Sequence, residues 1–244
     1  MAQLLAFLAL TFTLAWTIFL TVPPRGGLNP LFLLGVFAPS LAAIAVTVSC
    51  GGAQGVRALL APLSRVDVGI RWYAFAILFM PLVKVGAAAG VRLIDSAFPP
   101  LGSNLALLPF AVLLSTPIQA GEEIGWRGFA LPRLADRIGM RAASILLGLI
   151  WAVWHLPLFY VPGADTTGQS FPVYLAQVTA ISVAMAWLYA HTGGSLLLVM
   201  LMHSSINQAT FIVPAAIAPS THPWTMAASR MSWLTWPSPS RLTA

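Results

Sequence analysis

Two adjacent glutamates, Glu122 and Glu123, end an almost wholly apolar stretch in GEEIGWRGFALPRL, residues 121–134. They are two of only six acidic residues in the chain. Arg127 follows Glu123 by four residues, and this spacing puts an acid and a base on one face of a helix in the favourable order. The pattern favours a structural ion pair between Glu123 and Arg127.

Glu122 faces another direction, because neighbouring residues on a helix are rotated by about 100°. It therefore cannot share Arg127 equally. A carboxylate that is buried beside another carboxylate and lacks its own cation is a stronger base than one in water, which is the property that a general base needs. The alternative is that Glu122 simply reaches water at the membrane surface.

Two histidines and an asparagine lie in other apolar segments. His155 occurs in LIWAVWHLPLF, and His203 and Asn207 occur in LMHSSINQ, where a four-residue spacing stacks them on one helical face. Each is also explained by a hydrogen bond between helices. If they converge on Glu122, the site holds a base and donors for a developing oxyanion. Hydrolysis by an activated water is its simplest reaction, because no nucleophilic serine or cysteine stands out.

Lys84 is a further ionisable residue inside an apolar segment. Such residues are functional candidates by default, because charge is costly at membrane depth. Here a structural role is favoured, in which Lys84 extends its ammonium group to the interface or pairs with Asp95 or another carboxylate.

The composition requires a membrane protein. Of 244 residues, 59% are hydrophobic and 7% are charged, whereas a soluble domain carries about 25% charged residues. We expect an all-α polytopic transmembrane helical bundle, since isolated strands cannot satisfy their backbone in lipid. The net charge is +6, but the basic residues are scattered over short loops and form no basic stripe. This pattern argues against nucleic acid as a partner. The single cysteine, Cys50, excludes an internal disulfide and a cysteine-based metal cluster.

About seven runs, within a range of six to eight, are long and apolar enough to span a bilayer. They are 2–22, 30–49, 72–91, 104–121, 142–161, 171–190 and 195–218. The first has no basic flank or cleavage site, so it is interpreted as a retained helix. Segment 51–71 is mildly amphipathic and is expected along the interface. Residues 1–220 are expected to form one transmembrane domain, and 221–244 a disordered or interfacial tail.

Loop charges predict the orientation, because cytoplasmic loops are rich in arginine and lysine. The loops after the first, third and fifth runs carry only Arg25 and Arg92. The loops after the second and fourth runs carry Arg57, Arg65, Arg71, Arg133, Arg137 and Arg141. We therefore expect the N-terminus in the cytoplasm and the site opening toward the cytoplasm.

Three motifs in order resemble those of the CPBP family of intramembrane endopeptidases, which includes CAAX prenyl proteases and bacteriocin-processing or self-immunity proteins. Glu122 to Arg127 matches EExxxR, and His203 to Asn207 matches HxxxN. The second motif, FxxxH, is matched by Trp151 to His155 with tryptophan in place of phenylalanine. The resemblance covers about residues 104–212, which would be the protease-like core.

The resemblance implies a glutamate protease of the bacterial cytoplasmic membrane that uses no cofactor and no metal. Glu122 would activate water, His155 would help to hold that water, and His203 and Asn207 would stabilise the oxyanion. The pair of Glu123 and Arg127 would order the site. The substrate would be a peptide or protein in or at the membrane.

Two alternatives stay open. The first is a non-enzymatic membrane immunity or scaffold protein that retains the motifs. The second is a zinc-dependent hydrolase, since carboxylate and imidazole are competent zinc ligands, although the chain has no HExxH motif.

Overall fold

The computed structural model describes residues 1–24, 29–94, 105–162, 164, 166 and 169–209, and this part of the chain contains helices and no strand. Its α-helices are α1 (Ala2–Thr21), α2 (Pro30–Val36), α3 (Ala38–Leu60), α4 (Ile70–Ile94), α5 (Leu108–Ser115), α6 (Ala120–Glu123), α7 (Leu131–Trp154), α8 (Phe171–His191) and α9 (Leu196–Gln208). The other helical segments are a π-helix, η5 (Ile124–Ala130), and the short 3-10 helices η2 (Ala61–Ser64), η3 (Leu105–Leu107), η4 (Thr116–Gln119) and η6 (Leu156–Phe159).

The prediction of an all-α membrane bundle is confirmed. Five helical stretches in the described part are long and apolar enough to cross a bilayer. They are Ala2–Thr21, Ala38–Ser64, Ile70–Gly90, Leu105–Trp154 and Phe171–His191. Helix α9 is apolar but shorter, with 13 residues. The end of the seventh expected run, beyond residue 209, and the expected tail at 221–244 lie outside the described residues.

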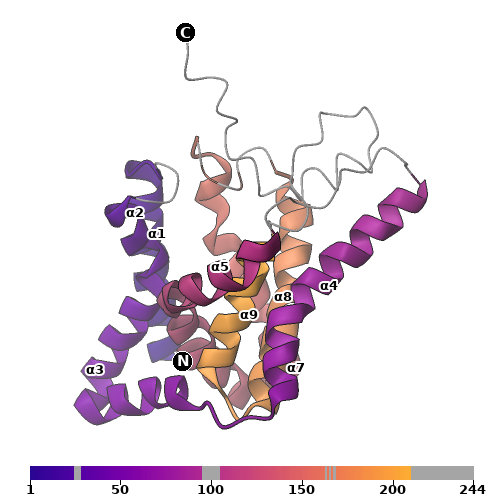
Figure 1. Cartoon of the computed structure of the whole chain (residues 1–244). Coiled ribbons are helices and arrows are strands. Elements are labelled where there is room, and N and C mark those ends of the chain that lie inside the picture. Colours follow the sequence, from indigo (N-terminus) through magenta and orange to yellow (C-terminus); the bar gives the residue numbers. More distant parts are fainter. Residues whose placement is uncertain (25–28, 95–104, 163, 165, 167–168, 210–244) are drawn as a thin grey trace.

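The second expected run is divided between α2 and α3. Asn29 caps α2 by accepting a hydrogen bond from the backbone N–H of Leu31 at 3.1 Å, and Pro30 opens the helix. Inside α3, Gly52 adopts φ +55°, a left-handed conformation that favours glycine. From there α3 and η2 run across one end of the bundle (Figure 1), consistent with the interfacial position expected for 51–71.

The fourth and fifth expected runs both fall within the helical stretch Leu105–Trp154, and Gly139, with φ +76°, kinks α7 between them. The chain passes from α5 through η4, α6 and η5 into α7 without a non-helical loop. Figure 1 shows α5 lying across the bundle rather than along it. Pro109, Pro117 and Pro132 each fall in the first turn of a helical segment, where proline is tolerated because its missing N–H is not needed.

Glycines let the helices around the site approach closely. A Cβ at Gly125 would come within 2.5 Å of the backbone of Pro39 in α3. One at Gly148 would lie 2.7 Å from the Cα of Thr179 in α8. Close packing of this kind drives helix association in membranes, where lipid removes most of the hydrophobic driving force. The two glycines therefore hold η5 against α3 and α7 against α8.

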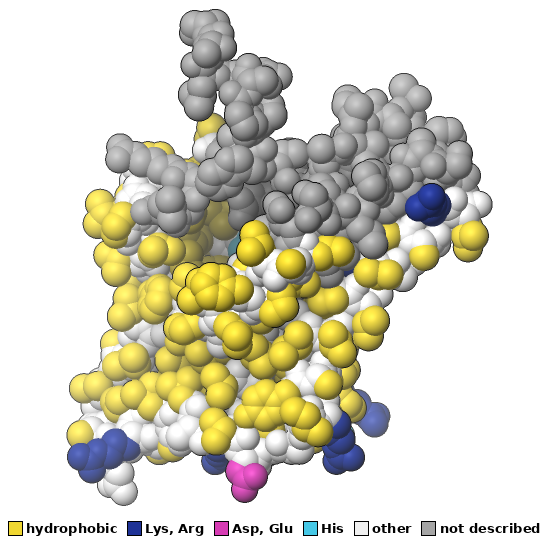
Figure 2. Space-filling model, viewed as in Figure 1, with side chains coloured by type: hydrophobic (Ala, Val, Ile, Leu, Met, Phe, Trp, Pro, Cys, Tyr) yellow, Lys and Arg dark blue, Asp and Glu magenta, His cyan; other side chains and the backbone are white. Residues whose placement is uncertain are grey.

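Apolar side chains cover much of the flank of the molecule, and most of the visible arginine and lysine side chains gather at its lower end (Figure 2). That end contains the turn between α8 and α9, where Ser195 Oγ donates to the carbonyl oxygen of Arg65 at 2.6 Å. The connection from α3 through η2 to α4, which carries Arg65, lies at this end (Figure 1). Which side of the bilayer it faces stays a prediction.

Candidate active site

Glu123 is fully buried and is held by two partners. Arg127 Nη1 donates to both of its carboxylate oxygens, at 2.9 and 3.1 Å. His203 Nδ1, on α9, donates to Oε1 at 2.7 Å. Neither Glu123 nor Arg127 has any exposed surface. The ion pair that the four-residue spacing predicts is therefore present, and it also fixes one ring nitrogen of His203.

The π-helix η5 begins directly after Glu123 and contains Arg127. Such wide helical turns are rare and occur frequently at functional sites. All residues of η5 are buried except Gly128, which is partly exposed. The arginine is therefore enclosed within the bundle, where an unpaired charge would be costly, and the carboxylate of Glu123 neutralises it.

Glu122 has a different partner. The indole Nε1 of Trp151, on α7, donates to Glu122 Oε2 at 2.7 Å. Glu122 Oε1 makes no hydrogen bond to any residue that the structure describes. Glu122 is 6% exposed, so one of its oxygens is held in place and the other is available to a small molecule.

Trp151 connects the motifs. Its ring lies 4.3 Å from the guanidinium carbon of Arg127, within the range of a cation–π contact. It also meets the ring of His203 edge to face, with centroids 5.3 Å apart. One indole thus touches Glu122, Arg127 and His203, which come from three separate helical segments. In the sequence, Trp151 was notable only because it stands in place of the phenylalanine of the FxxxH motif.

His155 lies directly after α7 and is half-buried. Its Nδ1 is 2.8 Å from the carbonyl oxygen of Trp151. Because a carbonyl only accepts, Nδ1 carries the proton, and in the neutral ring Nε2 presents a lone pair. The ring packs edge to face on Trp154 and Tyr174, with centroids 4.6 and 5.5 Å away. This tautomer suits an acceptor for water.

Asn207 is one helical turn beyond His203 and is half-buried. Its side-chain amide donates to Gln119 Oε1 at 3.4 Å. Beside it, Gln208 Nε2 donates to Ser115 Oγ at 3.1 Å. Gln119 was not among the residues chosen from the sequence, although its signal was there: an amide in an apolar run, four residues before Glu123.

The structure thus brings Glu122, Glu123, Arg127 and His203 together around Trp151. It places His155 beside the same indole and Asn207 further along α9. We expected Glu122 to be the glutamate that faces the histidines, but the direct histidine contact belongs to Glu123. Glu122 and His203 both contact the indole of Trp151.

The described residues contain no group of three or more histidine, cysteine, aspartate or glutamate side chains that could hold a metal ion. Glu123 and His203, the two potential donors in direct contact, bind each other.

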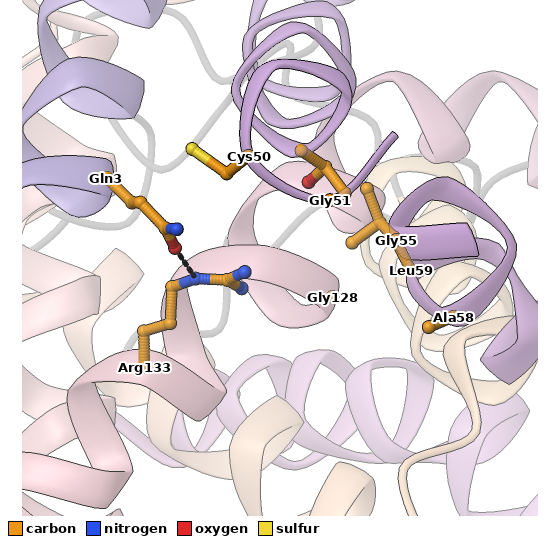
Figure 3. Close-up of a pocket in the computed structure, with 9 residues that line it drawn as sticks. Gln3, Cys50, Gly51, Gly55, Ala58, Leu59, Gly128 and Arg133 are labelled. Carbon is orange, nitrogen blue, oxygen red and sulfur yellow. Dashed lines mark hydrogen bonds between the residues drawn. The ribbon is translucent and has the colours of Figure 1, made fainter. Parts of the chain in front are cut away.

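A cavity of about 340 Å³ lies at the arginine-rich end and is separate from these residues. Figure 3 shows that Gln3 and Arg133 meet across it. Its lining residues are Gln3, Thr47, Cys50, Gly51, Gly55, Ala58, Leu59, Gly128 and Arg133. None of the residues chosen from the motifs lines it.

Fold and site together define a polytopic helical membrane protein with a buried cluster of glutamate, arginine and histidine. Residues 102–209 match the family described as type II CAAX prenyl endopeptidase Rce1-like. CAAX prenyl protease 2 from Methanococcus maripaludis is 30% identical over 92 residues, which cover 35% of this chain and 34% of that relative. The match thus spans about a third of the curated relative. The segment that carries the three motifs is thus similar to the CAAX protease family, in agreement with the resemblance of the motifs.

Proposed function

We propose that this protein is an intramembrane endopeptidase that hydrolyses a peptide bond in a membrane-associated or lipidated peptide or protein. The observation that carries the proposal is Glu122, a buried carboxylate with one oxygen bound to Trp151 and the other without a partner among the described residues. A held carboxylate with one free oxygen suits a general base acting on water.

In the proposed mechanism, Glu122 Oε1 takes a proton from the attacking water. His155 Nε2 helps to hold that water. The hydroxide attacks the substrate carbonyl. Asn207 and the Nε2–H of His203, which is then the imidazolium paired with Glu123, donate hydrogen bonds to the resulting oxyanion. The proton then passes from Glu122 to the leaving amine. The Glu123–Arg127 pair orders the site and takes no part in proton transfer.

We propose further that residues 1–220 act as one domain with its protease core at 104–212, and that the arginine-rich end faces the cytoplasm of a bacterial cell. The half-buried site residues, His155 and Asn207, lie at the ends of α7 and α9 away from that end. Substrate would therefore approach from within the bilayer rather than through the arginine-rich face, which differs from the opening toward the cytoplasm that we expected from the sequence.

The test is cleavage of a prenylated, fluorogenic peptide by the purified protein in liposomes. Glu122→Gln keeps the size of the side chain and removes the base, so turnover should fall by at least about 100-fold. The unfolding temperature should stay close to that of the wild type. Full turnover by this variant would refute the role of Glu122.

Two further measurements separate the alternatives. Activity that a chelator abolishes and stoichiometric zinc restores would favour the zinc hydrolase. A cellular phenotype that is unchanged by Glu122→Gln would favour the non-enzymatic immunity or scaffold protein.

A further inference from the structure

The cavity at the arginine-rich end lies where four helical segments meet (Figure 3). It has a volume of about 340 Å³. Its wall includes Gln3 from α1, Thr47 and Cys50 from α3, Gly128 from η5 and Arg133 from α7. These segments are distant in sequence, yet they enclose one space, and no step of the proposed mechanism uses it.

The guanidinium group of Arg133 is fixed in the wall of this cavity but is only partly bonded. Its Nη1 donates to the carbonyl oxygen of Phe129 at 2.9 Å, and its central carbon lies 3.6 Å from the centroid of the Phe129 ring. Its Nε donates to Gln3 Oε1 at 3.5 Å. Arg133 Nη2 makes no hydrogen bond or ion pair with any residue that the structure describes. The side chain is therefore held in place with one NH₂ group left for a ligand.

Gln3 supplies a second hydrogen-bond donor beside this group. Its Oε1 faces Arg133, and its Nε2 belongs to the same amide at the edge of the cavity (Figure 3). Within the described part of the chain, Gln3 Nε2 makes no hydrogen bond. A guanidinium and an amide N–H placed side by side fit an anion that offers several oxygen atoms, such as a phosphate group.

The other polar groups near the cavity do not neutralise Arg133. No acidic residue of the described part lines this cavity. Asp136, one turn after Arg133, is exposed and lines an adjoining cavity of about 270 Å³. Thr47 Oγ1 is buried and has no hydrogen-bond partner among the described residues. A cavity with one cation, uncharged polar groups and no carboxylate attracts an anion.

The surroundings of the cavity indicate that this anion belongs to a lipid. Leu5 on α1 and Val48 on α3 are 58% and 53% exposed, and they follow Gln3 and Thr47 closely in sequence. Both helices therefore present apolar side chains to acyl chains beside the cavity. The part of α3 beyond Gly52 runs across the same end of the bundle (Figure 1). Lipid phosphates lie at such a level, just outside the hydrocarbon core.

We propose that this cavity binds the phosphate group of an anionic phospholipid, with Arg133 as its cation and Gln3 as a further donor. A lipid is favoured over inorganic phosphate because its acyl chains also gain contact with the exposed apolar side chains of α1 and α3. An anionic lipid is favoured over phosphatidylcholine because choline would bring a second cation beside the guanidinium. The bound lipid would contact Gly128 and thereby the π-helix that carries Arg127.

The test measures lipid binding and does not depend on cleavage. The full-length protein in detergent is titrated with phosphatidylglycerol and, separately, with phosphatidylcholine that has the same acyl chains. Native mass spectrometry counts the bound lipids. We expect phosphatidylglycerol to bind about tenfold more tightly, as for one charge-assisted hydrogen bond.

Substitutions on α7 test the role of the guanidinium. Arg133→Gln should lose the preference for phosphatidylglycerol, and Arg133→Lys, which keeps the charge without the planar fork, should keep part of it. The matched control is Arg141→Gln, which removes an exposed cation from the same helix outside the cavity. This control should bind both lipids like the wild type.

A second experiment leaves Arg133 and its contacts intact. Cys50 is the single cysteine of the chain, and it is exposed and lines the cavity. Reaction with N-ethylmaleimide attaches a group to its sulfur that should fill part of the cavity and weaken phosphatidylglycerol binding. Cys50→Ser protein treated in the same way lacks the thiol and should bind like the untreated wild type.

Equal binding of the two lipids by the wild type would overturn the inference, and so would an undiminished preference in Arg133→Gln. An equal loss in Arg141→Gln would show that general surface charge selects the lipid. Unchanged binding after alkylation of Cys50 would place the lipid elsewhere. If inorganic phosphate displaces phosphatidylglycerol at concentrations equal to that of the lipid, the ligand is a soluble anion and the assignment to a lipid is wrong.

Discussion

The hydrogen bond from Trp151 to Glu122 makes a sharp prediction. Replacing Trp151 by phenylalanine keeps an aromatic ring beside Arg127 and His203 but removes the N–H that holds Glu122 Oε2 at 2.7 Å. Phenylalanine is also the residue of the FxxxH motif, so the ring itself is compatible with this kind of site. The change therefore isolates one hydrogen bond.

The expected loss follows from the nature of that bond. A hydrogen bond to a charged group contributes about 1.5–3 kcal/mol, and about 1.4 kcal/mol corresponds to a factor of ten. Both Glu122 and Trp151 are buried, at 6% and 4% exposure, so water replaces the lost donor poorly. We expect kcat to fall by about 10- to 100-fold. The KM should change little, because the bond holds the base and not the substrate.

The assay is turnover of the fluorogenic peptide in liposomes over a range of peptide concentrations. Trp154→Phe is the matched control, since it makes the same change three residues away on the same helix. Trp154 Nε1 is buried and has no hydrogen-bond partner among the residues that the structure describes, so its removal breaks none of the described bonds and should cost only packing. Measured unfolding temperatures separate packing from positioning in both variants.

Two results would refute the reasoning. If Trp151→Phe keeps kcat within about twofold of the wild type, the hydrogen bond to Glu122 does not position a base. If Trp151→Phe and Trp154→Phe lower kcat equally, the loss reflects packing around His155 and not the bond.

Three further outcomes are expected. Glu123→Gln leaves the buried arginine uncompensated and should destabilise the fold by about 3–5 kcal/mol, which lowers the unfolding temperature measured in detergent. The control, Asp136→Asn, changes an exposed carboxylate and should have almost no effect. Equal shifts in the two variants would contradict a stabilising role of the Glu123–Arg127 ion pair. Gly148→Ala brings a Cβ to 2.7 Å from the backbone of α8 and should cost about 1–3 kcal/mol. A Cβ at Gly86 would meet no atom of the described residues within 4 Å, so Gly86→Ala should be neutral in the same unfolding assay. Cys50 is exposed at the arginine-rich end, so a membrane-impermeant maleimide should label inverted vesicles and spare intact cells; the reverse pattern would place that end outside.

Helices with uninterrupted apolar sequences were predictable from the chain. The runs expected at 2–22 and 171–190 differ from α1 and α8 by one residue at the C-terminal end. The run at 30–49 was not predictable in the same way. Its division between α2 and α3 occurs at Phe37, which ends one helix and starts the next. Hydropathy over a long window averages across such a break.

Within the site, local relations were predictable and contacts between segments were not. The Glu123–Arg127 pair follows from a spacing of four residues. The bonds from Trp151 to Glu122 and from His203 to Glu123 join residues 29 and 80 positions apart. They depend on how α7 and α9 approach α6, which no local pattern specifies. For the same reason, the sequence did not reveal which glutamate meets the histidine.

The π-helix between Glu123 and Leu131 has a consequence for how this segment can vary among relatives. Wide turns of this kind hold a residue in excess of the regular helical repeat. Deleting one residue from 124–126 would let the segment return to ordinary α-helical pitch, but it would shorten the spacing from Glu123 to Arg127 from four residues to three. Substitutions within the segment are therefore tolerated when the new side chain has a suitable size and polarity. A change of length between Glu123 and Arg127 instead alters the geometry of their ion pair. We expect a survey of homologous sequences to show varied residues but no insertions or deletions between these two positions.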